Sequence, residues 1–278
     1  MLRRISSNRA LMGQTHSVSS VSIYLAVLAF YPALILKMTG SNEVIIYILS
    51  IFLIAGASLL PDLDNTKSTA HSTLGPVGTV FSYFFRGTSK AIQSVFSTNR
   101  DDTSNPHRGF WHTLVSVAVV FFAVWGSVSI PVSFALFGVT ITIGEIFAFI
   151  WTNLCMQLAF SGAFSGFINK MFPKKARSAA VSILSVIFAV VAIYFSANVV
   201  QSYGWIAYMV GFGYLAHLLG DALTTSGVPL FWPLKIKGKL WYRVRLTKMK
   251  AGGDIEKYVI LPFFIILGIA SIVILLKG

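Results

Sequence analysis

The sequence predicts an all-α protein: a polytopic bundle of about seven transmembrane helices whose N-terminus is cytoplasmic. Of the 278 residues, 55% are hydrophobic and only 11% are charged, whereas a soluble domain has about a quarter charged residues. Apolar runs recur at the length of about 20 residues that a helix needs to cross a bilayer. The basic residues lie almost entirely in alternate connections between these runs, as the positive-inside rule requires of cytoplasmic loops.

The expected spans form a single membrane-embedded domain over residues 1–278. Glycine, proline and short polar residues separate consecutive spans, as at Gly40 to Asn42 and at Gly126 to Pro131. The first run is longer than a signal-peptide core and no small-residue cleavage site follows it, so we expect a retained helix. The spans are expected at residues 17–36, 44–60, 111–126, 132–152, 179–199, 204–223 and 258–276.

The net charge of +13 is explained by membrane topology. With a cytoplasmic N-terminus, 20 of the 22 Lys and Arg residues fall on the cytoplasmic side, and only Lys37 and Lys277 fall outside. We therefore expect membrane lipids as partners and no nucleic acid. Two cytoplasmic segments are long enough for structure of their own. Residues 66–106 contain a stretch typical of an interfacial helix, and the basic residues 224–257 suit a loop at the lipid headgroups.

Histidine and aspartate residues gather at the cytoplasmic ends of four predicted spans. Ionisable groups at membrane depth are costly and mark a functional site by default. His217 and Asp221 are four residues apart, so both side chains lie on one helix face, and imidazole and carboxylate groups are ligands for zinc. Each residue alone has an ordinary structural alternative, but their convergence favours a metal site. The predicted ligands are His16, Asp62, Asp64, His107, His112, His217 and Asp221.

Three other polar residues receive different interpretations. Arg108 lies at a helix start between two histidines, where an anion such as phosphate is favoured. Glu145 is predicted at mid-span and is not placed in the site. His71 is expected to be a structural residue. The single cysteine, Cys155, lies in an apolar stretch and is expected to pack.

Ordered motifs then identify a family resemblance. They read LPDLD at residues 60–64, HRGFWHT at 107–113 and GYLAHLLGD at 213–221, with a Thr-His element at residues 15–16. Together they resemble the YdjM/YbcI-like family of membrane-bound metal-dependent hydrolases. A remoter similarity links this family to zinc-dependent phospholipase C and P1-type nucleases. Trp111 and Thr113 depart from the family's usual Thr and Ser, and neither change removes a ligand.

The resemblance implies metal-assisted hydrolysis with one to three divalent ions, zinc foremost. We expect the substrate to be a phosphoester of a lipid or lipid-linked molecule at the cytoplasmic face of the plasma membrane. Asp64 would orient the attacking water as general base, and Arg108 would hold the anionic substrate oxygen. Two alternatives stay open. A divalent-metal transporter would need ionisable groups along the membrane mid-depth, and a non-catalytic protein would retain only a structural metal.

Overall fold

The structure, a computed structural model, describes residues 2–66, 68–98, 101, 108–136, 138–200 and 202–277. The described chain is mostly helical, as predicted, with short 3-10 turns at Pro61–Asp64 and Phe110–His112 and a π-helical turn at Glu256–Ile260. The α-helices are α1 (Leu2–Phe30), α2 (Pro32–Thr39), α3 (Val44–Ala57), α4 (Thr69–Val95), α5 (Leu114–Val128), α6 (Ile143–Ser161), α7 (Ser165–Met171), α8 (Arg177–Val199), α9 (Trp205–Ala222) and α10 (Leu261–Lys277).

Four helical segments are long and apolar enough to cross a membrane, and a bent helix pair is a fifth candidate. The four are Val44–Asp64, Ile143–Ser161, Arg177–Val199 and Glu256–Lys277. Helices also occupy the two remaining predicted spans, but neither meets these criteria. Helix α5 has only 15 residues, and α9 carries polar residues in its last turns. The described residues therefore contain four to five candidate spans, fewer than the seven expected.

The first predicted span, residues 17–36, is not one straight helix. Helix α1 ends at Phe30 and α2 begins at Pro32, and the two axes differ by 110°. Proline has no backbone N–H and disfavours a helical conformation in the residue before it. Tyr31 accordingly leaves the helical region, with φ −137° and ψ 56°. The prediction of a single continuous helix there was wrong.

The fourth predicted span, residues 132–152, begins too early. Strands β1 (Ser133–Leu136) and β2 (Val139–Thr142) form an antiparallel hairpin ahead of α6. Gly138 has φ 80°, a left-handed conformation that glycine adopts readily, and β2 is a run of β-branched residues that favours a strand. A capping box then starts α6: Glu145 Oε2 accepts from the Thr142 N–H, and Thr142 Oγ1 accepts from the Glu145 N–H. Glu145 therefore lies in the first turn of α6 and not at mid-span.

Close helix crossings hold α3 at the centre of the bundle. A Cβ on Gly56 would lie 1.8 Å from the Cys155 carbonyl oxygen on α6, and one on Gly213 of α9 would lie 2.6 Å from the Ile54 oxygen. Glycine at both positions lets α3 approach two neighbours at backbone contact. Cys155 is buried there, as expected. These contacts fix the end of α3, and the turn that follows it, against α9.

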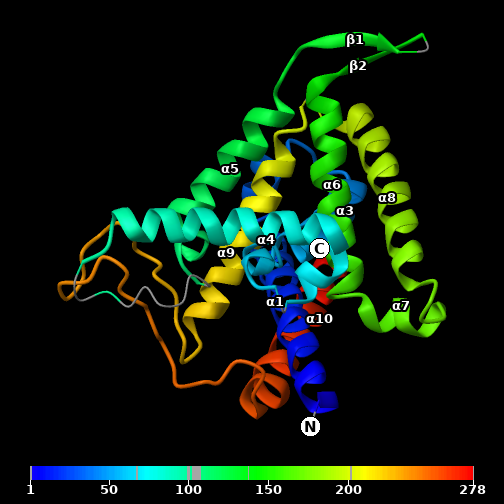
Figure 1. The fold of residues 1–278 in the computed structure, drawn as a ribbon. Coiled ribbons are helices and arrows are strands. Elements are labelled where there is room, and N and C mark those ends of the chain that lie inside the picture. The colour runs from blue at the N-terminus through cyan, green and yellow to red at the C-terminus, as the bar shows by residue number, and fades with distance from the viewer. Residues whose placement is uncertain are drawn as a thin grey trace.

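Helix α4 confirms the helix predicted within residues 66–106. It runs crosswise to α6 and α8 across the middle of the molecule (Figure 1). It packs on the Pro61–Asp64 turn, and the segment 224–257 is joined to the region after α4 by hydrogen bonds from Trp241 to Phe96 and Asp101. Helix α4 therefore lies next to the turn that carries Asp62 and Asp64, and the segment 224–257 is attached beyond its C-terminal end.

Candidate metal centre

Four separate elements bring imidazole and carboxylate groups to one buried point. His16 comes from α1, Asp62 and Asp64 from the turn after α3, His112 from the turn before α5, and His217 and Asp221 from α9. Two sets of three residues each offer ligand atoms within 4.8 Å of one another. The sets are His16, His217 and Asp221, and Asp62, His112 and His217.

Asp221 lies at the centre of the cluster and is 1% exposed. Its Oδ1 atom accepts a hydrogen bond from Arg108 Nη2 at 2.6 Å and lies 3.6 Å from His16 Nε2. Its Oδ2 atom lies 3.6 Å from both His112 Nε2 and His217 Nε2. The Asp221 carboxylate therefore faces three imidazoles and one guanidinium. Its Oδ1 atom faces Arg108 and His16, and its Oδ2 atom faces His112 and His217.

The turn after α3 supplies the opposite wall. His112 Nδ1 lies 3.6 Å from Asp64 Oδ2, and His217 Nε2 lies 3.9 Å from Asp62 Oδ1. The Arg108 backbone N–H also donates to Asp64 Oδ2 at 3.3 Å. Asp64 is buried, whereas the Asp62 side chain keeps 18% of its surface exposed. The cluster is therefore closed on most sides and reaches solvent nearest Asp62.

A backbone carbonyl orients His217, and the ring of His16 stacks on it. The Nδ1 atom of His217 is 2.6 Å from the Ser58 carbonyl oxygen, and this contact assigns the proton to Nδ1 and leaves the Nε2 lone pair facing Asp221. The His16 ring stacks on His217 at 4.1 Å between centroids. Gly220 permits this stacking, since a Cβ at that position would lie 3.0 Å from His16 Nδ1.

The charge of the cluster fits a divalent cation. Three carboxylates meet one guanidinium in the part of the chain that is described, and buried charges are costly unless they are compensated. His217 Nε2 and Asp221 Oδ2 are buried and have no hydrogen-bond partner among the described residues. Their separation of 3.6 Å is close to the roughly 3.4 Å between two ligands of a tetrahedral zinc at about 2.0–2.2 Å. These residues therefore fit a metal ion.

The structure brings together six of the seven predicted ligands. His107 lies outside the described residues. Arg108 is buried at the cluster, where Nη1 donates to Thr224 Oγ1 at 2.9 Å and Nη2 donates to Asp221. His71 stands apart as expected, with Nδ1 bonded to the Gly78 carbonyl on α4. Sequence reasoning missed Ser58, Gly220 and Thr224, of which only Thr224, three residues after Asp221, has a visible signal.

Residues 11–164 and 177–277 match the family described as YdjM inner membrane protein. The chain belongs to this family. Two curated relatives, the inner membrane proteins YdjM of Escherichia coli (strain K12) and of Shigella flexneri, are 34% identical to it over 53 residues. That match covers 19% of this chain and 25% of each relative. No solved structure matches the chain.

Family membership confirms the resemblance that the motifs predicted. This YdjM-family protein is an inner, or plasma, membrane protein, in agreement with its several candidate spans. The cluster of His and Asp is buried and can hold a metal ion.

Proposed function

We propose that this YdjM-family protein is a metal-dependent hydrolase that cleaves a phosphoester of a lipid or lipid-linked substrate at the cytoplasmic interface. The observation that carries the proposal is a largely buried cluster in which, among the described residues, three carboxylates and three imidazoles lie around one guanidinium. A purely structural ion pair needs no such excess of ligand atoms. A hydrolytic centre does, because metal, water and substrate must all be held.

The proposed ligands are His16, Asp62, Asp64, His112, His217 and Asp221, with His107 added from the sequence. Bound zinc lowers the pKa of water from about 15.7 to about 7 and so supplies hydroxide at neutral pH. One to three ions are consistent with the two overlapping sets of ligands.

Two residues are assigned further roles in the reaction. Asp64 orients the attacking water as general base, since Oδ2 faces the cluster and is held by the Arg108 N–H. Arg108 holds the anionic oxygen of the substrate, since its guanidinium lies against Asp221 at the centre of the cluster. Arginine is suited to phosphate because its planar fork of donors matches two oxygens at once.

The proposed location of the substrate follows from topology. We keep the interpretation that seven spans cross the membrane with α5 and α9 among them, and that the basic segments face the cytoplasm. The C-terminal ends of α3 and α9, with His16 from the middle of α1, then bring the cluster to the cytoplasmic headgroup level. A phospholipid or lipid-linked phosphate reaches this depth without leaving the bilayer.

The transporter alternative has weaker support. It requires ionisable groups along a path at mid-depth, and Glu145 was the only residue that offered one. Glu145 instead caps the start of α6, where it is partly exposed. The alternative of a non-catalytic protein with a structural metal predicts the same bound ion, so only turnover separates it from the hydrolase.

The deciding experiment is a screen of phosphoester and phospholipid substrates with purified protein, with and without chelator. We expect hydrolysis that chelation abolishes and zinc restores. His217→Ala and Asp62→Ala should lose both turnover and bound metal. His71→Ala is the matched control, because the His71 side chain bonds to the Gly78 carbonyl of its own helix and belongs to neither ligand set, and it should retain both. Full activity of His217→Ala on a verified substrate would falsify the assignment.

A further inference from the structure

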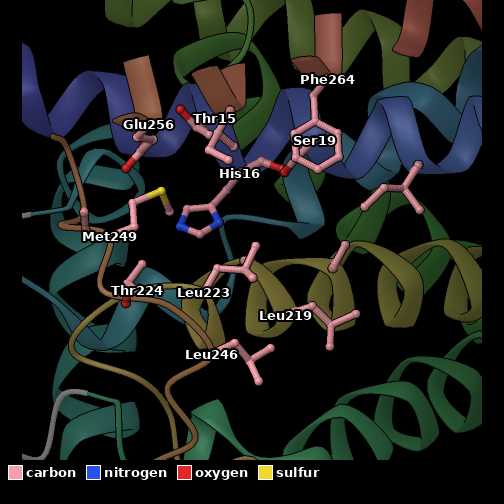
Figure 2. Close-up of a pocket in the computed structure, with 15 residues that line it drawn as sticks. Thr15, His16, Ser19, Leu219, Leu223, Thr224, Leu246, Met249, Glu256 and Phe264 are labelled. Carbon is pink, nitrogen blue, oxygen red and sulfur yellow. The ribbon is translucent and has the colours of Figure 1, made fainter. Parts of the chain in front are cut away.

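An apolar pocket adjoins the metal centre between α1, α9 and α10. Its volume is about 180 Å³, and His16 projects into it from α1 (Figure 2). Residues of the segment 224–257 close one side, Leu246 and Met249 among them. His16 is shared between this pocket and the metal centre, because its Nε2 lies 3.6 Å from Asp221 Oδ1. The pocket therefore adjoins the cluster at His16.

Most of the polar groups of the pocket lie toward one end of it. Thr15, Thr224 and Glu256 lie on one side of His16 together with Met249, whereas Leu219 and Phe264 lie on the other side together with Ser19 (Figure 2). Glu256 Oε2 accepts from the Gly252 N–H at 2.7 Å. Thr224 Oγ1 accepts from Arg108 Nη1 at 2.9 Å, so this end of the pocket adjoins the metal centre.

The apolar end runs along the helices and not across them. Its lining recurs at helical spacing: residues 16, 19 and 23 on α1, residues 216, 219 and 220 on α9 with residue 223 directly after it, and residues 260 and 264 in the π-helical turn and the start of α10. Helices α1 and α10 both belong to candidate membrane spans and pack against each other. The pocket therefore extends from the cluster toward membrane depth, which is the direction of a lipid chain.

We propose that this pocket binds the first segment of one hydrocarbon chain of the substrate while the phosphate lies at the metal centre. This inference rests on the proposed function and names its substrate class as a phosphoester carried directly by an apolar chain. An apolar cavity of about 150 Å³ holds a benzene ring. The space here therefore suits about six carbons of one chain and excludes a bulky or two-chain anchor at this point.

The pocket positions the hydrocarbon chain more than it increases the affinity for it. Lipid tails are as apolar as leucine side chains, so a chain that moves from the bilayer into the pocket gains little hydrophobic free energy. A chain held along α9 instead fixes the distance from its first carbon to His16 and Asp221. Leu219 and Phe264 would then select the shape of the chain that reaches the cluster.

Photo-cross-linking tests the proposal in zinc-loaded protein in nanodiscs. The probe is octyl phosphate with a diazirine on its chain, and octyl phosphate and octanol are the competitors. We expect cross-links at Ile23 and Phe264, with octyl phosphate competing at least about tenfold better than octanol, a difference of about 1.4 kcal/mol. Equal competition by octanol would mean that the pocket holds any lipid chain, and would overturn the assignment.

A pair of variants separates the pocket from the lipid-facing surface. Ala216→Phe fills the pocket and should reduce these cross-links about tenfold, whereas Ala270→Phe adds the same ring at an exposed position of α10 and should leave them unchanged. Leu219→Trp is a second filling variant, since Leu219 is 45% exposed and a larger side chain has room. Cross-links concentrated at the exposed Ile265 and Ile269 in every variant would contradict the proposal.

Failure of this inference is distinguishable from failure of the proposed function. Methyl phosphate has a phosphoester but no chain that could occupy the pocket, so its zinc-dependent hydrolysis tests the centre alone. Hydrolysis of methyl phosphate without pocket cross-links would refute the chain site and leave the hydrolase standing. Pocket cross-links without any hydrolysis would refute the hydrolase and leave a binding site for alkyl phosphates.

Discussion

Gly220 of α9 lies directly against the imidazole ring of His16 on α1. A Cβ at position 220 would be 3.0 Å from His16 Nδ1 and 3.2 Å from its Cε1 atom. The same ring stacks on His217 and faces Asp221. The absence of a side chain at Gly220 therefore sets how closely α1 can bring its histidine to the ligands of α9.

Gly220→Ala should weaken metal binding without unfolding the protein. The added methyl group pushes the His16 ring by a few tenths of an ångström, and disturbed orientation of metal ligands typically costs about 10- to 100-fold in affinity or activity. Zinc titration of the purified variant measures the loss. Gly126→Ala is the control, because nothing lies within 4 Å of a Cβ there, and alanine is the better helix former. Unchanged zinc affinity in Gly220→Ala would remove His16 from the ligand set.

Arg108→Met should make the protein more dependent on metal for its stability. Removing the guanidinium leaves the carboxylate of Asp221 buried without its cationic partner, which typically destabilises a protein by about 3–5 kcal/mol. A bound divalent ion compensates that charge. The rise in melting temperature on adding zinc should therefore be larger in Arg108→Met than in the unmodified protein.

Arg86→Met supplies the matched comparison for that measurement. Arg86 lies on α4, outside the cluster, so its loss should leave the zinc-induced shift unchanged. An equal shift in all three proteins would show that Arg108 and the metal do not compensate the same carboxylate.

Most of the candidate site could be predicted because placing ionisable side chains in apolar segments costs free energy. His217, Asp221 and Asp64 are polar groups at the ends of apolar segments, and the sequence alone shows that they need partners. The Ser58 carbonyl and Gly220 could not be found in this way. A carbonyl becomes available only where a helix ends against another element, and the close approach at Gly220 depends on how α1 and α9 cross.

The errors in the fold share a different physical cause. Hydropathy measures how apolar a segment is and does not distinguish a strand from a helix, so the hairpin before α6 was included in a span. The β-branched run Val139–Thr142 was the signal that separates them. Pro32 was equally visible, but proline also occurs within transmembrane helices. The presence of Pro32 therefore did not show whether the helix would continue with a small kink or bend by 110°.

Gly56→Ala should destabilise the bundle severely. Its Cβ would lie 1.8 Å from the Cys155 carbonyl oxygen, and a backbone atom cannot move aside as a flexible side chain can. Overpacking of a core typically costs about 1–3 kcal/mol, and the loss here should reach or exceed the upper end. Thermal unfolding in detergent measures it. Gly87→Ala on α4 has open space around its Cβ, so a similar loss in both variants would contradict close α3–α6 packing.

Asp101 should make the attachment of the segment 224–257 depend on pH. Its carboxylate accepts hydrogen bonds from the Trp241 N–H at 2.9 Å and from Thr98 N–H and Oγ1. Partial burial acts to raise the pKa of Asp101, but hydrogen bonds from Thr98, Trp241 and Leu240 outweigh it and hold the pKa below its ordinary value. Because the pKa of Asp101 is lower in the folded than in the unfolded protein, its carboxylate stabilises the folded state at pH values above the unfolded pKa of about 3.9. This stabilisation is lost as the pH falls through the folded pKa.

Limited proteolysis and hydrogen exchange around Trp241 measure this attachment. Protection should be constant near neutral pH and should fall only below about pH 4, where the carboxylate becomes protonated. Asp101→Asn should show the low-protection state already at neutral pH, because an amide accepts fewer hydrogen bonds than a carboxylate and accepts them more weakly. Asp254→Asn changes the same group at an exposed position and should leave protection intact. Full protection of Trp241 in Asp101→Asn would mean that other contacts, such as the bond from Trp241 Nε1 to the Phe96 carbonyl, hold the segment by themselves.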